Sequence, residues 1–263
     1  MITSSQNPKI KRIRHLQTQA RFRKKESAFV VEGIRLIEEI VTAKLLPELV
    51  IYTRDLDQRG FSLLKKLIAQ DISCEEVSEN VLKYASDTES PQGILSVLPW
   101  IDLPFPPEID FVLIADEIRD PGNLGTLLRT ARAAGVCAVL LSPGTVDPYS
   151  PKVLRSGMGA HFSLPIRSLS WKEIQQFTKD LTIFGTDISQ GVQYWDADLQ
   201  PPLGLIIGGE AHGSGEQASQ LTQEWVHIPM LEQTESLNAS AAGAILMYEI
   251  VRQRYLSQKT KDI

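Results

Sequence analysis

The later part of the chain alternates short apolar runs with stretches of helical periodicity. The runs are almost continuously apolar, and they read "FVLIAD" (111–116), "CAVLLS" (137–142), "LTIFGTD" (181–187) and "LGLIIGGE" (203–210). Strands without a polar side belong to parallel sheets that helices cover on both faces. The pattern therefore predicts an α/β domain with a parallel sheet, and a long helix that begins near Leu237 closes it.

The earlier part of the chain shows a smaller α/β pattern. The segment 29–44, "FVVEGIRLIEEIVTAK", starts as an extended run and continues with Ile34, Ile37 and Ile40 at helical spacing. A strand is predicted at 49–53, a second helix at 61–70 and a closing strand at 92–98. These elements are sufficient for a small α/β domain that precedes the larger one.

A proline-rich segment, "LPWIDLPFPPEID" (98–110), separates the two patterns. Proline removes an amide donor and disfavours helix before it, so this segment is predicted to be a stiff linker. The expected organisation is an N-terminal domain at 1–98, a linker at 99–110 and a second domain at 111–263.

The charge of the chain is distributed unevenly. The net charge is −5, yet residues 1–35 hold nine Lys and Arg against only Glu26 and Glu32. Such a segment can bind a polyanion although the whole protein is acidic. A solubilising, partly frayed N-terminus explains the same charges, and composition leaves both alternatives open. The candidate contacts to a polyanion such as RNA are Lys9, Lys11, Arg12, Arg21, Arg23, Lys24 and Lys25.

Composition and spacing disfavour several classes of protein. No apolar run approaches the roughly 18 residues of a membrane span, and the basic N-terminus lacks the apolar middle of a secretory signal, so a soluble, cytoplasmic protein is expected. The four histidines are scattered, and Cys74 and Cys137 form no CxxC pair, so no metal site is expected. A Ser-His-Asp hydrolase is disfavoured because GxSxG is absent.

The first polar stretch of interest is "DPGNLGTLLRTARAAG" (120–135), which lies where a nucleotide-binding protein carries its phosphate loop. Its spacing fits neither GxGxxG nor GxxxxGK followed by Ser or Thr. Pro121 and Gly122 favour a turn, Asn123 suits the start of a helix, and Arg129 follows on that helix. An ordinary capped helix with a solvated arginine also explains these residues, so a functional interpretation requires partners elsewhere.

Two further polar stretches follow predicted strands. In "IIGGEAHGSGE" (206–216), the glycines permit close approach of a ligand, and Glu210 disfavours phosphate but suits a cationic group or ribose hydroxyls. In 227–250, Ser236 or Asn238 can cap a helix that begins with small residues. A glycine-rich turn and a packed core helix explain them as well. Because parallel strands share one carboxyl edge, chemistry is expected in the loops 116–125, 186–190, 208–215 and 228–238.

Taken in order, the stretches "DPGNLGTLLRTARAAG", "IIGGEAHGSGE" and "IPMLEQTESLNASAAGAILMYE" closely resemble the three motifs of the SpoU (TrmH-like) RNA methyltransferases of the SPOUT superfamily. The resemblance covers about residues 110–255, and three ordered motifs are far more specific than one. Less closely, "FVVEGIRLIEEI" and "SPQGILSVL" resemble the substrate-binding domain that precedes the catalytic domain in members acting on ribosomal RNA.

The resemblance implies a fold and a reaction. Members of the family transfer a methyl group from S-adenosylmethionine to a ribose 2′-hydroxyl of RNA. The C-terminal part of their α/β catalytic domain is threaded into a deep trefoil knot, an exception among folds. In relatives the C-terminal helix lies at a homodimer interface, so a homodimer is expected here.

The substrate is less closely defined than the reaction. The additional N-terminal domain favours 23S ribosomal RNA, and transfer RNA is the alternative. A catalytically inactive RNA-binding relative is disfavoured because all the polar site residues are present, and a nucleotide-dependent dehydrogenase is disfavoured because GxGxxG is absent.

The resemblance also assigns roles to residues by position. The implied catalytic residues are polar and come from all three motifs, namely Asn123, Arg129, Glu210, Ser236 and Asn238. The implied contacts to S-adenosylmethionine are made largely through backbone groups, at Thr186, Gly208, Ile228 and Leu237. One departure is His212, which stands where the family often has a basic or acidic residue.

Overall fold

A computed structural model of the chain describes residues 1–200, 202–209, 213–231 and 236–261. The chain forms two compact units. The first consists of Met1–Asp102 with Asp147–Phe162, and the second of Leu103–Val146 with Ser163–Ile263. Residues 100–110, within the predicted linker, contain no helix or strand.

The first unit is built on a four-stranded sheet with the order β1-β4-β2-β3. The strand β4 runs antiparallel to both of its neighbours, whereas β2 and β3 are parallel. The strands predicted at 49–53 and 92–98 are present as β2 and β4. The bounds are β1 (Ala28–Glu32), β2 (Leu49–Tyr52), β3 (Cys74–Glu76) and β4 (Ile94–Pro99).

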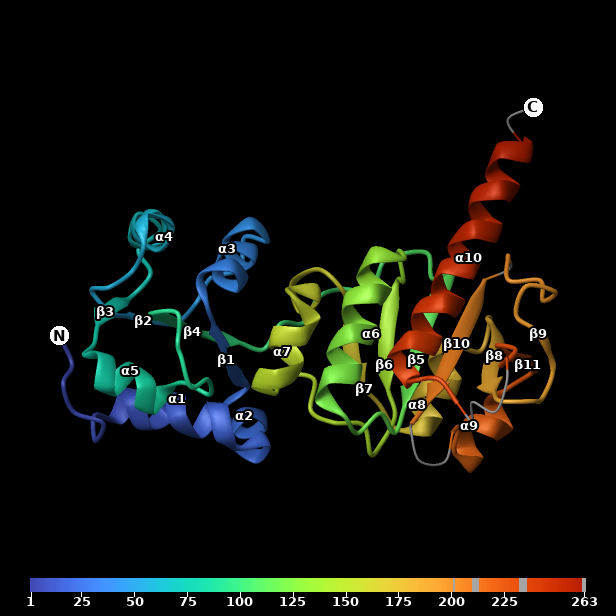
Figure 1. Cartoon of the computed structure of the whole chain (residues 1–263), viewed down its shortest axis with the longest axis horizontal. Coiled ribbons are helices and arrows are strands. Elements are labelled where there is room, and N and C mark those ends of the chain that lie inside the picture. Colours follow the sequence, from blue (N-terminus) through green and yellow to red (C-terminus); the bar gives the residue numbers. More distant parts are fainter. Residues whose placement is uncertain (201, 210–212, 232–235, 262–263) are drawn as a thin grey trace. The chain divides into compact units, whose positions relative to one another are not determined.

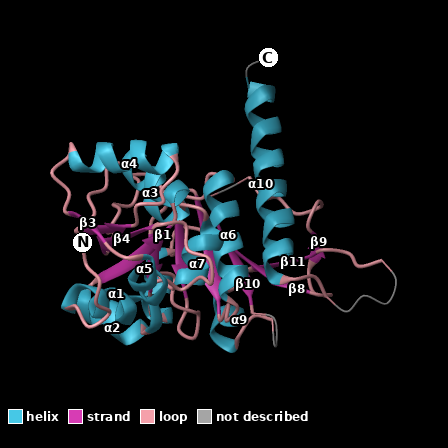
Figure 2. Ribbon diagram, turned by 60° about the vertical axis from the view of Figure 1, so that its left-hand side comes forward, coloured by secondary structure: helices cyan, strands magenta, loops and turns pink. Residues whose placement is uncertain are grey.

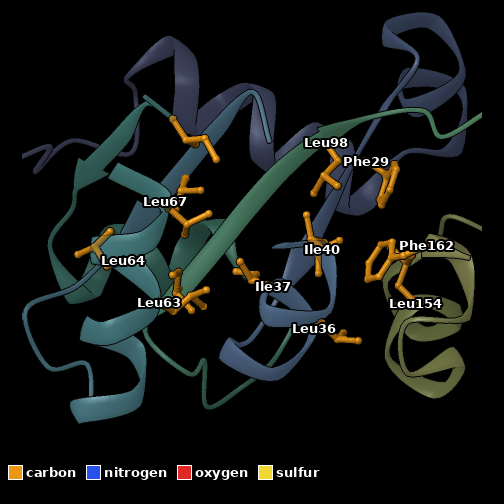
Figure 3. Close-up of a cluster of buried hydrophobic side chains, with 14 of the residues drawn as sticks. Phe29, Leu36, Ile37, Ile40, Leu63, Leu64, Leu67, Leu98, Leu154 and Phe162 are labelled. Atoms are coloured by element: carbon orange, nitrogen blue, oxygen red, sulfur yellow. The ribbon is translucent and has the colours of Figure 1, made fainter. Parts of the chain in front are cut away.

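Helices cover both faces of this sheet. On one face lie α3 (Ile34–Thr42) and α4 (Gln58–Ile68), and on the other α1 (Pro8–Thr18), α2 (Ala20–Glu26) and α5 (Glu79–Ala85) (Figure 1). The side chains beneath α3 and α4 form one buried cluster, which includes Ile37 of α3, Leu67 of α4 and Phe29 of β1 (Figure 3). The apolar residues that recur at helical spacing in α3 and α4 therefore face the sheet.

The basic N-terminal segment is folded into helices. Asn7 caps α1 by accepting a hydrogen bond at 2.9 Å from the amide two residues later, and Pro8 occupies the first helical position, where a missing donor is tolerated. Ile10, Ile13 and Leu16 are fully buried in the cluster beneath α1 and α5. The frayed N-terminus considered for residues 1–35 is wrong over the helices, because these apolar residues anchor α1 to the sheet.

Arg23 of α2 has a structural role. Its guanidinium contacts the carboxylate of Asp147 at 2.7 and 2.8 Å and donates a hydrogen bond to the carbonyl of Leu16 at 2.6 Å. The side chain is buried, and a buried cation requires such a partner. Arg23 is therefore withdrawn from the predicted RNA contacts, since its charge is neutralised inside the first unit.

The segment that contains Asp147 packs in the first unit, although sequence reasoning placed it in the second domain. It forms α7 (Pro151–Gly157) and a short 3-10 helix, η1 (Ala160–Phe162). Leu154 and Phe162 lie in the same buried cluster as Phe29 (Figure 3). These apolar contacts explain why the segment belongs to the first unit.

The second unit contains a seven-stranded sheet with the order β7-β6-β5-β10-β8-β11-β9, and every neighbouring pair is parallel. The four predicted strands are β5, β6, β8 and β10, so the predicted parallel sheet is confirmed. The pattern did not predict the short strands β7, β9 and β11. The bounds are β5 (Phe111–Asp116), β6 (Ala138–Leu141), β7 (Ile166–Ser168), β8 (Thr182–Asp187), β9 (Val192–Gln193), β10 (Leu203–Gly208) and β11 (Glu224–His227).

Helices also cover both faces of the parallel sheet. On one face α6 (Pro121–Ala133) and α10 (Ala239–Lys261) lie side by side (Figures 1 and 2), and α8 (Trp171–Phe177) and α9 (Glu216–Leu221) cover the other. Gly243 permits close packing of α10, because a Cβ at this position would lie 2.4 Å from the Cδ2 atom of Leu127 in α6. Among the described helices, none is long and apolar enough to cross a membrane.

Candidate active site

The turn after β5 places Asn123 in the first turn of α6. Asp120 is the N-cap of this helix, and its carboxylate accepts a hydrogen bond from the amide of Asn123 at 2.8 Å. Pro121 occupies the first helical position, which needs no intrahelical donor. Asp120 caps the helix with its own side chain, and the side chain of Asn123 joins this turn to another segment.

That segment is the start of α10. Nδ2 of Asn238 donates a hydrogen bond to Oδ1 of Asn123 at 2.9 Å. Oδ1 of Asn238 in turn accepts hydrogen bonds from the amide and the hydroxyl of Ser240, at 3.0 and 2.6 Å. The fold thus joins two of the expected catalytic residues, which are 115 positions apart. Sequence reasoning noted Ser240 only as a small residue, so its part in this group was missed.

A cavity of about 270 Å³ lies at the carboxyl ends of β8, β10 and β11. All four residues expected to contact S-adenosylmethionine line it, together with Ser236 of the third motif. The lining residues are Thr186, Asp187, Ile188, Ile207, Gly208, Gly209, Gly213, Val226, Ile228, Met230, Ser236, Leu237, Ala239, Ala242 and Leu246. The cavity therefore lies at the edge where the ligands of parallel sheets bind.

Two glycines form a tightly packed wall of the cavity. A Cβ at Gly208 would lie 2.3 Å from the carbonyl carbon of Gly213, and a Cβ at Gly209 would lie 2.6 Å from the carbonyl oxygen of Glu117. Any larger residue at either position would displace the backbone, since real Cβ contacts are not this short. The two adjacent glycines in "IIGGEAHGSGE", Gly208 and Gly209, are therefore required by close backbone packing beside the cavity.

Asp187 adds a negative charge to the lining. The backbone amides of Ser189 and Gln190 each donate to its carboxylate at 2.9 Å, and the Ser189 hydrogen bond contributes most to a pKa of Asp187 below its usual range. A carboxylate that stays ionised suits ribose hydroxyls or a cationic group. The sequence indicated the loop 186–190 but did not single out this residue.

Arg129, another expected catalytic residue, is not joined to this group in the described structure. The side chain of Arg129 is exposed on α6, and it makes no hydrogen bond or ion pair with the described residues. Six positions along a helix correspond to a rotation of about 240° from Asn123, so the two side chains leave α6 on different sides. Glu210 and His212 lie outside the described residues.

The arrangement suits an organic ligand with apolar and polar parts. The cavity is lined mainly by apolar side chains and glycine backbone, and its volume is close to the lower end of small-molecule pockets. None of its described lining residues is basic, which disfavours a phosphate ligand. In the described part of the chain, no group of three His, Cys, Asp or Glu could hold a metal ion.

Several known proteins are similar to this chain over almost its whole length. The 23S rRNA (guanosine-2′-O)-methyltransferase RlmP of Bacillus subtilis is 32% identical over 95% of this chain and 98% of its own. An uncharacterised tRNA/rRNA methyltransferase of Synechocystis is 35% identical over 97% of this chain and 94% of its own. The crystal structure of the SpoU methyltransferase AviRb from Streptomyces viridochromogenes, in complex with AdoMet, is similar with a TM-score of 0.86 and 26% identity, over 95% of this chain and 99% of that one.

Two family models also match. Residues 7–96 match the MRM3-like substrate binding domain. This range contains the helices α1 to α5 and the strands of the first unit as far as β4. Residues 110–248 match the SpoU rRNA Methylase family, and this range contains the cavity and the Asn123–Asn238 pair. The chain therefore belongs to the SpoU rRNA methylase family, as its three sequence motifs predicted.

Proposed function

We propose that this protein is an S-adenosylmethionine-dependent methyltransferase that modifies a ribose 2′-hydroxyl of large-subunit ribosomal RNA. The observation that carries the proposal is the cavity at the carboxyl edge of the sheet. Ser236 and Leu237 line it, and the next residue, Asn238, is hydrogen-bonded to Asn123. A cofactor pocket and a pair of polar side chains from two motifs thus lie next to each other.

The lining of the cavity fits S-adenosylmethionine. Apolar side chains such as Ile228 and Leu237 suit the adenine ring, and the backbone at Gly208 can supply hydrogen bonds without a side chain in the way. The carboxylate of Asp187 suits the ribose hydroxyls or a positively charged centre. When bound, this cofactor supplies a methyl group on a sulfonium, which is an excellent leaving group.

The protein residues must orient the ribose hydroxyl and stabilise it as its proton leaves. Asn123 and Asn238 are held in a fixed mutual orientation by their hydrogen bond, so they can position the hydroxyl. An arginine guanidinium is a permanent cation rather than a proton acceptor, so Arg129 serves as a cation beside the developing alkoxide and the adjacent phosphate. The proton leaves through water or a neighbouring acceptor. Glu210 is the residue we expect to orient Arg129 or Asn123.

The active form is a two-fold symmetric homodimer. Large apolar side chains remain exposed along one side of α10, and they include Ile245, Tyr248 and Leu256. A second copy of the chain would cover this side. The exposed position of Arg129 on the neighbouring helix α6 suits a site that it completes in the partner subunit. The proposal further includes the trefoil knot that the family resemblance implies and a cytoplasmic location.

The reaction can be tested directly. Purified protein with methyl-labelled S-adenosylmethionine is expected to label unmodified 23S ribosomal RNA more strongly than transfer RNA. After alkaline hydrolysis, the label should remain in dinucleotides, because chain cleavage needs the free 2′-hydroxyl. Label found only on a base would contradict 2′-O-methylation, and label confined to transfer RNA would identify the alternative substrate.

The basic surface of α2 is expected to contribute to RNA affinity. Arg21, Lys24 and Lys25 are exposed on this helix, whereas Lys9 and Arg12 of α1 already pair with acidic residues. Each phosphate that is neutralised contributes roughly −0.7 to −0.9 to the slope of log K against log salt. The Ala variant of the three α2 residues should therefore flatten this slope by about 2 to 3.

A matched control keeps the change in net charge and moves it elsewhere. Replacing Lys65, Lys172 and Lys179, which are exposed on other helices or at their ends, removes the same three charges. The slope of this control should stay closer to that of the unmodified protein, and cofactor affinity should be unaltered in both variants. Equal slopes for the two triple variants would mean that α2 does not contact RNA.

A further inference from the structure

Asp116, the last residue of β5, is a buried carboxylate without a role in the proposed chemistry. Only 1% of its surface is exposed. Its Oδ1 accepts a hydrogen bond from the hydroxyl of Ser142 at 2.7 Å, and its Oδ2 accepts one from the backbone amide of Gly215 at 2.8 Å. Asp116 therefore links three chain segments at the carboxyl edge of the sheet, at the ends of β5 and β6 and in the loop after β10.

The hydroxyl of Ser142 extends this link to the next residue of the chain. It accepts a hydrogen bond from the amide of Glu117 at 3.0 Å while it donates to Asp116. Glu117 has a φ of 49°, in the left-handed region that residues other than glycine rarely adopt. The hydrogen bond fixes this turn, and Asp120 caps α6 only three residues later. The same network therefore also orients the helix that carries Asn123.

The loop after β10 is held at two points on the end of β5. The carbonyl of Glu117 packs against Gly209, and the carboxylate of Asp116 binds the amide of Gly215. Between these points, Gly213 donates its amide to the carbonyl of Gly209 at 3.1 Å. Gly209 and Gly213 both line the cavity, so the position of this wall depends on Asp116.

The energetics favour a single arrangement. A buried carboxylate is costly unless hydrogen bonds satisfy it, and hydrogen bonds to a charged acceptor are stronger than neutral ones. If the loop moved away, Asp116 would lose the amide of Gly215 and remain buried with an unsatisfied oxygen. The cost of that state restrains the loop in the position that forms the cavity.

We infer that Asp116 is a positioning residue for methyl transfer, which clamps the cofactor wall, at Gly209 and at Gly213–Gly215, to the turn that starts α6. Through this clamp the two sides of the site, the cofactor cavity and the side chain of Asn123, keep a fixed relation. The inference rests on the proposed function of the cavity, and it assigns no contact between Asp116 and substrate or cofactor.

The test compares two substitutions by calorimetric titration with S-adenosylmethionine. Asp116→Ala removes both acceptors and should weaken cofactor binding by about tenfold or more, the effect expected for a lost hydrogen bond to a charged group. Asp116→Asn keeps an oxygen for the amide of Gly215 and places a donor beside Ser142, so it should restore affinity to within a few-fold. Ser142→Ala, which removes one link only, should give an intermediate loss.

A control separates positioning from general stability. Ile114→Val removes a methyl group two residues earlier on β5, on the side that packs under α8 and α9, and lowers the thermal midpoint without touching the loops. Its cofactor affinity should stay unchanged. If Asp116→Ala fails to fold, the Ser142→Ala and Asp116→Asn pair gives the same comparison against this control.

Two results would overturn the inference. One is cofactor affinity in the folded Asp116→Ala variant, or in Ser142→Ala if the first does not fold, that equals the affinity of the unmodified protein. The other is a loss of cofactor affinity in Ile114→Val as large as the loss in Asp116→Ala, because affinity would then simply follow the thermal midpoint. Failure of the proposed function has a separate readout, which is methylation of RNA by the unmodified protein. If that protein binds S-adenosylmethionine but does not methylate RNA, the proposed function is wrong and the comparison of cofactor affinities still tests the role of Asp116.

Discussion

Arg129→Ala is expected to reduce methyl transfer by a factor of about 100 to 1,000 or more while S-adenosylmethionine still binds normally. The magnitude is that of removing one preorganised group that stabilises a developing oxyanion. The side chain is exposed and makes no bond within the described residues, so its removal should leave the fold intact. Single-turnover rates at saturating RNA, together with calorimetric titration of the cofactor, measure the two effects separately.

Two comparison variants sharpen this prediction. Arg132→Ala removes the same charge from the exposed surface of the same helix, three residues later, and should retain most of the activity. Gly208→Val should have the opposite profile and weaken cofactor binding, since even its Cβ would lie 2.3 Å from the backbone of Gly213. Near-full turnover by Arg129→Ala at saturating RNA would show that the assigned role is wrong.

The parallel sheet and the edge at which the candidate cavity lies could be predicted from local patterns. Each central strand is an apolar run with a distinct end, and the carboxyl edge of such a sheet is where ligands bind. Thr186, Gly208, Ile228 and Leu237 all line one cavity because they follow or end strands at this edge. Local sequence is sufficient here because strand direction and strand end together determine the edge.

The N-terminal helices were missed because charge dominates their sequence. Ile10, Ile13 and Leu16 form an apolar stripe at helical spacing, but basic residues stand between them and the segment resembles a solvated tail in composition. The burial of Arg23 depends on Asp147, which is 124 residues away along the chain. No local pattern shows that an arginine in a basic run is neutralised by so distant a partner.

Asp116 illustrates the same limit within the site. In the sequence it ends the apolar run "FVLIAD", and no adjacent residue indicates that it has a special role. Its partners are 26 and 99 residues away, at Ser142 and Gly215. The family resemblance placed Asn123 and Asn238 in one expected site, but it did not predict the hydrogen bond between them. Tertiary contacts of this kind become visible only when the sheet brings the loop ends together.

The dimer proposal leads to a prediction about two impaired variants. Arg129→Ala and Asn238→Ala should each be strongly impaired, because the proposal assigns Arg129 to the alkoxide and Asn238 holds Asn123 through a hydrogen bond of 2.9 Å. In the proposed dimer, each site combines Arg129 of one chain with Asn238 of its partner. A mixed dimer of the two variants therefore contains one site with both residues intact and one site with neither.

Co-refolding the two variants with different affinity tags, followed by sequential purification, yields the mixed dimer for assay. About half of the activity of the unmodified dimer is expected to return, since one of two sites is complete. Each variant refolded alone in the same way provides the control and should keep only its low residual activity. If every site were built within one chain, both sites of the mixed dimer would lack a residue, so a verified mixed dimer without activity would refute the composite site.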